Sequence, residues 1–238
     1  MKIGIIGYGE IGSSLGKVYS EFSQFEVCVL DPFIGLNDDL TGSSILNICI
    51  PFISDFINVV NDYIDRFKPG LVVIHSTVAP GTTAKIVGNV CHSPVRGLHP
   101  NLDTGIKTFL KYIGSEDSSI AIQYQDHLNE LGISSYVCIN SKTTEYAKLL
   151  DTTYYGVCIA FHAEVMEVCE RENIDFDEVM TLYNKSYNDG YTKLNKINVV
   201  RPVLYGTKKI GGHCVTSNAN ILKNYMDSNA IQLVLKYE

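Results

Sequence analysis

The sequence predicts an α/β fold in which a Rossmann-type, doubly wound parallel sheet is followed by a helical domain built on one long helix. Apolar strand-like runs alternate with helix-like segments over the first 140 residues, and the glycine motif GYGEIG directly follows the first run. Residues 141–173 then contain no proline and one glycine, and their apolar residues recur at helical spacing. We therefore expect two domains, residues 1–140 and residues 141–238.

The expected strands are short apolar runs that are separated by helix-like or turn-forming segments. One helix is expected in EIGSSLGKVYSEF, after the first strand, and another over 52–67, where apolar residues follow helical spacing. TVAPGTT at 77–83 is expected to be a turn that leads into a helix. The expected strands lie at 2–6, 25–30, 44–50, 71–75 and 135–139, and YIG at 112–114 is a candidate for a further short one.

The second domain is predicted to begin with one helix over 141–173, capped by Ser141 or Thr143. A further helix is expected over 175–187, and a polar, tyrosine-rich loop follows it. The segment KIGGHCVTSNANIL then brings a single cysteine, Cys214, to the expected start of another helix. A helix amino terminus favours the thiolate form of a cysteine, so the sequence indicates a reactive thiol at this position.

Composition excludes several classes of function. The formal net charge of the 238-residue chain is -7 and lysine and arginine form no run, which disfavours nucleic acid and anionic membranes as partners. No apolar run approaches the ~18 residues of a membrane span, and glycines break the amino terminus too early for a signal peptide. Seven cysteines occur without a CxxC pair, which is typical of reduced thiols in a cytoplasmic protein. The cysteines and six histidines show no zinc-ligand spacing, so we expect no metal.

GYGEIG fits the GxGxxG fingerprint of a dinucleotide site, because it follows a strand, opens a helix and precedes a carboxylate at Asp31. Gly7 would permit the tight turn, Gly9 would let the backbone approach a pyrophosphate, and Gly12 would let the helix pack on the strand. Asp31 would accept hydrogen bonds from ribose hydroxyls and repel a 2′-phosphate, which favours NAD over NADP. The expected contacts of this motif are Gly7, Tyr8, Gly9, Glu10, Ile11, Gly12 and Asp31.

Two later turns, CIPF at 49–52 and HSTVAPGTT at 75–83, follow expected strands. Ligands of parallel sheets bind along the carboxyl ends of the strands. Pro51, Ser76 and Thr77 are therefore candidate cofactor neighbours, although either turn could be purely structural. His99, in RGLHPNL, is a candidate substrate contact, and a role in stabilising its own turn is equally open.

The ordered set of motifs GxGxxG, CIP, STVxPGT, SPxR, TxExxK and GGxC resembles the UDP-glucose/GDP-mannose dehydrogenase family over residues 1 to about 225. GGHC is closest to the branch that acts on UDP-N-acetylated sugars. The resemblance implies NAD-dependent oxidation of a primary alcohol to an acid, with a small-molecule substrate such as a nucleotide sugar. It also implies a homodimer that forms through the long helix 141–173.

The resemblance carries three catalytic roles to this sequence. Cys214 matches the nucleophile, which forms a thiohemiacetal and then a thioester with the substrate. Lys148, in TTEYAKLL, matches the lysine that stabilises the oxyanion, and an ammonium group suits that task. Thr77 matches the threonine near the catalytic water. These three residues are the expected catalytic set.

Three positions depart from the family pattern. Thr152 replaces an asparagine, Asn218 replaces an aspartate, and Val95 in SPVR replaces a glutamate. In the family, the replaced groups position water or handle protons. The reaction of this chain could therefore consist of one hydride transfer or of two. Thr152, His99 and Asn218 stay candidate substrate contacts. The family also continues into a carboxy-terminal domain that binds the nucleotide, which this sequence is not expected to contain, so a nucleotide sugar is one candidate substrate among sugar-like molecules.

Two further hypotheses compete with the dehydrogenase. A non-catalytic NAD-binding protein would keep the fold without the reaction, as the three departures suggest. A relative of the β-hydroxyacid dehydrogenases would share the Rossmann domain, the helical domain and the helix lysine. Those enzymes need no cysteine, so GGHC makes them the weaker hypothesis.

Overall fold

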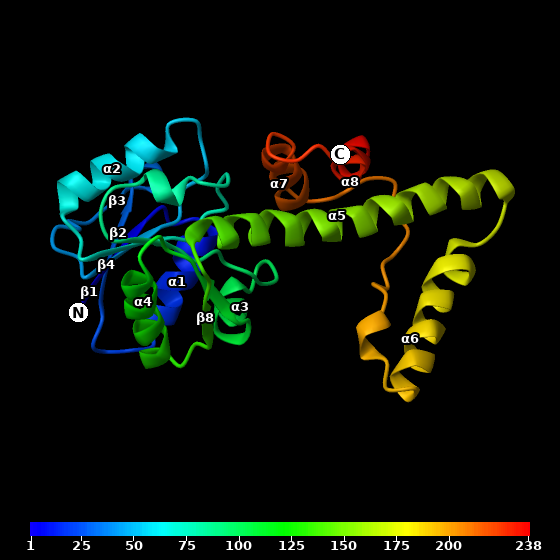
Figure 1. Cartoon of the computed structure of the whole chain (residues 1–238), viewed down its shortest axis with the longest axis horizontal. Helices are drawn as coiled ribbons and strands as arrows, with labels where there is room; N and C mark the ends of the chain where they lie inside the picture. Colours follow the sequence, from blue (N-terminus) through cyan, green and yellow to red (C-terminus); the bar gives the residue numbers. More distant parts are fainter. The chain divides into compact units, whose positions relative to one another are not determined.

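The computed structural model describes all 238 residues (Figure 1). The chain divides into two compact units, Met1–Lys148 and Leu149–Glu238. The long helix α5 (Ser141–Glu172) begins at the predicted domain limit, but its first two turns belong to the first unit. Lys148 is therefore the last residue of the first unit, whereas Cys214 lies in the second.

The first unit is built on a six-stranded sheet with the strand order β3-β2-β1-β4-β5-β6. All neighbouring strands are parallel except the short edge strand β3, which is antiparallel to β2. This confirms the predicted α/β class with its doubly wound sheet. The strands are β1 (Lys2–Ile6), β2 (Glu26–Asp31), β3 (Leu36–Asn37), β4 (Ile45–Ile48), β5 (Leu71–Ile74) and β6 (Val90–His92).

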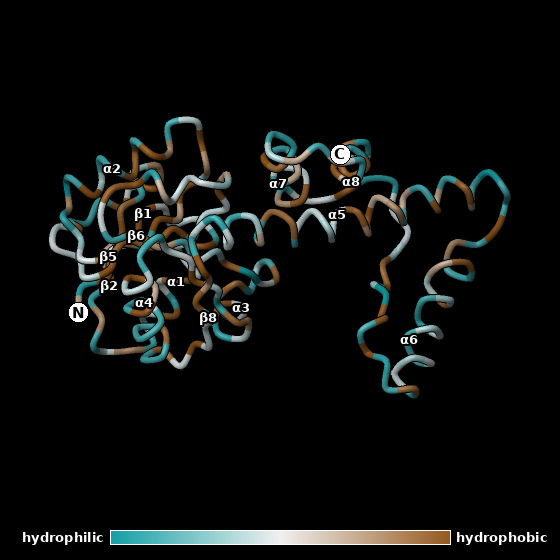
Figure 2. Tube along the Cα trace, viewed as in Figure 1, coloured by the Kyte–Doolittle hydropathy of each residue, from teal (hydrophilic) through white to brown (hydrophobic).

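Helices cover both faces of this sheet, so its strands are apolar on both sides. Ile5 packs in a cluster with α1 (Glu10–Ser20), α3 (Leu102–Thr108) and α4 (Ser118–Glu130). The next residue, Ile6, packs in a second cluster with α2 (Phe56–Phe67). Successive side chains of a strand point to opposite faces, which explains why the runs are continuously apolar. In Figure 2 these strands form the brown interior of the unit.

The predicted strand at 135–139 is not part of the main sheet. Its observed counterpart β8 (Ser135–Val137) pairs with β7 (Lys111–Ile113) in a separate two-stranded sheet. The fifth parallel strand is instead β6, which has only three residues and therefore gives no sequence signal of its own. A backbone bridge between His92 and Gly114 joins the two sheets. The turn at 77–83 leads only into a single 3-10 turn, Thr83–Lys85, and not into a helix.

The second unit contains most of α5, followed by a π-helical segment (Asp177–Leu182) that continues into α6 (Tyr183–Lys193), a 3-10 turn (Ile197–Val199), α7 (Cys214–Leu222) and α8 (Asn229–Lys236). The prediction that Ser141 or Thr143 caps α5 is wrong, by one residue for Ser141 and by three for Thr143. The Asn140 side chain is the cap, because its oxygen accepts the Thr143 N–H at 2.9 Å. α5 and α7 approach each other closely at Gly156, since a Cβ on this residue would collide with the Val215 side chain of α7. None of the helices is long and apolar enough to cross a membrane.

The turn after β1 depends on two glycines. Gly7 has a φ of +84°, a left-handed conformation that other residues rarely adopt. A Cβ on Gly12 would lie 1.9 Å from the Gly7 carbonyl oxygen, so α1 can start here only with glycine at this position. Gly9 is different, because a Cβ built on it meets nothing within 4 Å.

The first unit also buries a lysine in its polar interior. Lys111 is 4% exposed, and its Nζ donates to the carbonyls of Ser93 (2.6 Å) and Pro94 (3.3 Å). Its third contact is His75 Nδ1 at 3.3 Å, and His75 Nε2 faces the Asn47 oxygen at 2.9 Å. Burial lowers the pKa of Lys111 to about 7, and repulsion from Lys148 and Arg96 acts in the same direction.

We expect opposite outcomes for alanine at two glycines of one turn. Gly12→Ala should lower the melting temperature by several degrees, because the new methyl group collides with a rigid carbonyl and the helix must shift. Gly9→Ala should leave it nearly unchanged, since its methyl group faces open space. Thermal unfolding followed by circular dichroism checks both. Equal melting temperatures for the two variants would contradict the close approach of α1 to Gly7.

The stability of the protein should depend on Lys111 in a pH-specific way. Between pH ~7 and the lysine's unfolded value of 10.5, the unfolded chain holds a proton that the folded chain has released. The contribution of Lys111 to the free energy of unfolding should therefore rise with pH across this window and be flat below it.

The measurement is the difference in urea-unfolding free energy between wild type and Lys111→Met at several pH values. Subtraction of the variant removes the other titrating groups. Lys107→Met is the matched control, because Lys107 is exposed and pairs with Glu21 at 2.7 Å. A wild-type-minus-variant difference that stays constant from pH 7 to 10 would show that Lys111 keeps its proton in the folded state.

Candidate active site

Strand register brings four turns of the first unit to one edge of the sheet. The residues just past β1, β4 and β5 are Gly7, Cys49 and His75. Backbone hydrogen bonds hold these strand ends side by side, because the Cys49 N–H donates to the Ile6 carbonyl (2.8 Å) and the His75 N–H donates to the Ile48 carbonyl (3.0 Å). Ser93, after β6, continues the row through the Ile74 carbonyl at 2.9 Å. The strand order reverses between β1 and β4, which is where sheets of this type bind nucleotides.

The glycine turn forms an open cradle at the amino terminus of α1. Gly9 immediately precedes this helix, and the space beside its Cα is empty of protein atoms. The free N–H groups of a first helical turn favour an anion such as a pyrophosphate. The residues present therefore fit the phosphate portion of a dinucleotide.

Asp31 lies at the end of β2 beside this turn. Its carboxylate accepts the Tyr8 N–H at 2.8 Å and the Phe33 N–H at 3.2 Å, so both oxygens have a backbone partner. The side chain is half-buried and each oxygen keeps a further lone pair. The structure thus brings Asp31 and the glycine turn together, as an adenosine-ribose contact requires.

Other candidates of the glycine motif have distinct surroundings. Glu10 is exposed and pairs with His99 Nδ1 at 2.7 Å, which joins two predicted site residues from separate turns. The Tyr8 ring lies over Gly16 of α1, where a Cβ would meet its hydroxyl. Ile11 is half-buried and packs against the core, so its side chain points away from the cradle.

Ser76 connects the two later turns. It is 5% exposed, and its hydroxyl donates to the Ile50 carbonyl at 2.6 Å, in the CIPF turn. The next residue, Thr77, is half-buried, and Pro51 is exposed. Ser76 thus has a structural bond that fixes the position of Thr77 along the edge.

His92 forms a hydrogen bond to the turn that contains Ser76. Its Nε2 faces the Ser76 carbonyl at 3.2 Å and its Nδ1 faces the Thr144 hydroxyl at 2.7 Å. Burial lowers the pKa of His92 to about 3, and the charges of Lys111 and Lys148 act in the same direction. The ring is therefore neutral, and because a carbonyl can only accept, the proton sits on Nε2. Nδ1 faces the Thr144 hydroxyl, which also donates to the Ser141 carbonyl at 2.8 Å.

Glu145 binds the far end of the turn. It is fully buried on α5, and its carboxylate accepts the N–H groups of Gly81 and, at 2.8 Å, Thr83. The sequence contained a signal for this residue in the motif TxExxK, because Glu145 lies three residues before Lys148 and so on the same helix face. His92 gave no such signal, since it ends a strand, β6, that is too short to recognise.

Lys148 is half-buried and ends the first unit on the helix face that carries Thr144 and Glu145. Its influence on the pKa values of His92 and Lys111 places its charge near both groups. One turn later, in the second unit, Thr152 is also half-buried.

The second unit presents Cys214 at the first position of α7. It is the one exposed cysteine of seven, and it follows the Gly211-Gly212 pair and His213. Asn218, one turn later, is 5% exposed, and its side-chain Nδ2 has no hydrogen-bond partner. A buried donor without a partner is costly, so this amide is a feature that a bound ligand or water would satisfy.

Val95, where the resembling family has a glutamate, packs in the core of the first unit and has no access to a ligand. No group of three or more histidine, cysteine, aspartate or glutamate side chains is arranged to hold a metal ion.

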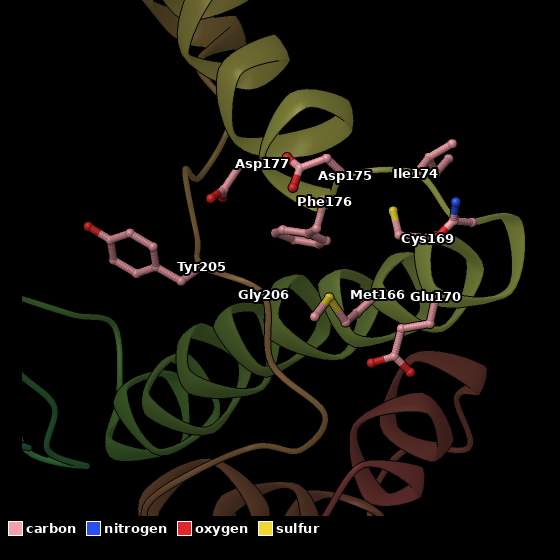
Figure 3. A pocket seen from close by; sticks show the side chains of 10 residues that line it. Met166, Cys169, Glu170, Ile174, Asp175, Phe176, Asp177, Tyr205 and Gly206 are labelled. Carbon is pink, nitrogen blue, oxygen red and sulfur yellow. The ribbon is translucent and has the colours of Figure 1, made fainter.

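A cavity of about 670 Å³ lies in the second unit, and none of the predicted residues lines it (Figure 3). Its apolar lining includes Met166, Cys169 and Phe176. Its carboxylates already have partners. Glu170 pairs with Lys208 at 2.7 Å, Asp175 accepts the Glu178 N–H at 2.9 Å, and Asp177 accepts from the Thr181 hydroxyl at 2.8 Å. The cavity therefore offers no unpaired carboxylate that marks it as the reacting site.

Comparisons with known proteins agree with this arrangement. Residues 142–236 match the model of the UDP-glucose/GDP-mannose dehydrogenase family, central domain. A UDP-N-acetyl-D-mannosamine dehydrogenase of Methanococcus vannielii is 25% identical over 221 residues, which cover 86% of this chain and 47% of the relative. The chain thus spans about half the length of that curated relative.

Solved structures support the fold. A UDP-D-ManNAc dehydrogenase from Pyrococcus horikoshii superposes with a TM-score of 0.78 at 19% identity, covering 100% of this chain and 68% of that one. A 3-hydroxyisobutyrate dehydrogenase of Mycobacterium tuberculosis reaches a TM-score of 0.69 at 10% identity, covering 99% and 91%. The fold is thus common to the nucleotide-sugar dehydrogenase and the 3-hydroxyisobutyrate dehydrogenase. The match to the central-domain model and the names of the curated relatives favour the first of these groups. Over residues 142–236 the chain is thus similar to the central domain of the UDP-glucose/GDP-mannose dehydrogenase family, and the curated relatives are UDP-N-acetyl-D-mannosamine dehydrogenases.

Proposed function

We propose that this chain is an NAD-dependent dehydrogenase that oxidises a primary alcohol, or the corresponding aldehyde, of a sugar-like substrate. The observation that carries the proposal is the open cradle at Gly9, formed by a helix amino terminus with a carboxylate, Asp31, beside it. The match of residues 142–236 to the central domain of a dehydrogenase family supports the assignment. The relatives named UDP-N-acetyl-D-mannosamine dehydrogenase make a nucleotide sugar the first substrate class to test.

NAD is the proposed cofactor, and it would supply the hydride acceptor. The N–H groups at the start of α1 would bind its pyrophosphate, and Asp31 would accept hydrogen bonds from the adenosine ribose. A 2′-phosphate would bring a second anion against Asp31, so NADP is disfavoured. Pro51, Ser76 and Thr77 belong to turns on the same edge and would border the cofactor.

Cys214 is the proposed covalent nucleophile. After the alcohol has lost one hydride and one proton, the thiolate adds to the aldehyde carbon and forms a thiohemiacetal. Loss of a second hydride gives a thioester, which water cleaves to the acid while the thiolate leaves. Its exposed position at the start of α7 suits this role, because a covalent nucleophile must be accessible to the substrate.

Lys148 is the proposed oxyanion stabiliser. An ammonium group there would offset negative charge on the substrate oxygen during hydride loss and during attack by the thiolate. Thr77 would hold the water that cleaves the thioester. Thr152, His99 and Asn218 are proposed substrate contacts, and the unpartnered Asn218 amide supports its inclusion.

A homodimer through α5 is the proposed assembly. Several large apolar side chains of this helix are exposed, which is unusual unless a partner covers them. Those in the second unit are Leu150, Tyr154, Tyr155, Phe161 and Val168.

A non-catalytic NAD-binding protein is the second candidate. The observation that favours it is Asn218, because an amide at this place on α7 cannot accept a proton as a carboxylate would. A related outcome is a single hydride transfer, with an aldehyde as the product. Both alternatives keep the cofactor cradle and differ in the use of Cys214.

Removal of the Cys214 thiol should abolish the reaction. We expect Cys214→Ala to lower NADH production on a nucleotide-sugar substrate by at least about a thousandfold, as for loss of a covalent nucleophile. The measurement is the rise in absorbance of NADH across nucleotide sugars, sugar phosphates and small hydroxy acids.

Cys158→Ala is the matched control, because this cysteine is half-buried within α5 and should tolerate alanine. Wild-type activity in Cys214→Ala would exclude a covalent mechanism. Binding of NAD by wild type without any NADH production would favour the non-catalytic candidate.

A further inference from the structure

The loop that carries Thr77 is fixed to the helix that carries Lys148 at both of its ends. At the first end, His92 donates to the Ser76 carbonyl, and its Nδ1 contacts the Thr144 hydroxyl of α5 at 2.7 Å. At the second end, Glu145 of α5 accepts the N–H groups of Gly81 and Thr83. These hydrogen bonds lie on both sides of residues 77–80 and thereby fix the positions of these residues.

These hydrogen bonds are shielded from solvent, which is unusual for a loop. His92 and Glu145 are fully buried, and Thr144 is 1% exposed. The segment between them is apolar and closely packed, since Val78 is fully buried and Ala79 is 7% exposed. Water does not compete with buried hydrogen bonds, so the loop and the helix should move as one body.

Thr144 and Glu145 lie four and three residues before Lys148, which puts them one helical turn away on the same face. A displacement of the loop therefore changes the separation of Thr77 and Lys148 directly. The distance between catalytic groups is a sensitive determinant of rate, because a misplacement of ~1 Å can cost about a hundredfold.

We infer that Glu145 and His92 are positioning residues of this site, which lock the loop 76–83, and with it Thr77, against the turn of α5 that bears Lys148. Neither residue is expected to touch substrate or cofactor. The inference rests on the proposed function, because Thr77 and Lys148 are catalytic only if the chain is a dehydrogenase.

The variant Glu145→Gln tests the clamp at its second end. Glutamine keeps the size of the side chain, but its amide nitrogen cannot accept the N–H that the lost carboxylate oxygen accepted. We expect backbone hydrogen exchange in residues 81–83 to become faster. We also expect kcat to fall by about tenfold to a hundredfold, with the KM for NAD unchanged.

A milder pair of variants tests the first end. Thr144→Val removes the hydroxyl that contacts His92 and the Ser141 carbonyl, and it keeps the shape of the side chain. Thr144→Ser keeps the hydroxyl. We expect Thr144→Val to lower kcat and Thr144→Ser to restore most of it. Glu172→Gln is the matched control, because Glu172 is exposed at the end of α5 and pairs only with Arg171 beside it.

Hydrogen exchange tests the hydrogen bonds between the loop and α5, and kcat tests their role in positioning. Unchanged exchange in Glu145→Gln would overturn the clamp itself. Faster exchange with an unchanged kcat would overturn the positioning role, as would equal activities of Thr144→Val and Thr144→Ser. A wild-type chain that makes no NADH on any substrate would instead refute the proposed function, and the positioning role with it.

Discussion

The close approach of α1 to the turn after β1 is the constraint on which the nucleotide-binding half depends. Only glycine at position 12 lets the helix begin within contact of the Gly7 carbonyl. Its amino terminus is then directed to the same edge as the ends of β4 and β5. The empty space at Gly9 and the position of Asp31 follow from this approach, because Asp31 is anchored by the backbone of the same turn.

A second constraint is the hydrogen bonding beneath that edge. Asn47, His75, Lys111 and His92 are buried polar side chains near the turns that follow β4, β5 and β6, and each has a partner on a neighbouring strand or turn. Such groups cost free energy to bury, and a satisfied network specifies one arrangement. The loop that bears Thr77 thus derives its position from the core of the sheet and from α5.

Sequence patterns predicted the elements that are long or strongly periodic. β1, β5 and α5 are continuous apolar runs or have clear helical spacing, so their limits agree closely with prediction. β6 has three residues, and the buried face of α4 includes His127 and Tyr124, which do not read as an apolar stripe. The partners of His92 and Glu145 were not predictable, because Thr144 is 52 residues from His92 and Thr83 is 62 residues from Glu145. Contacts of that separation are set by the folded sheet alone.

Isothermal titration of the whole chain with NAD and with NADP would show whether the first unit is an NAD site. We expect one NAD to bind per chain and NADP to bind at least about tenfold more weakly, because its 2′-phosphate meets the carboxylate of Asp31. Absence of any heat of binding with NAD, or equal affinity for the two dinucleotides, would contradict this assignment.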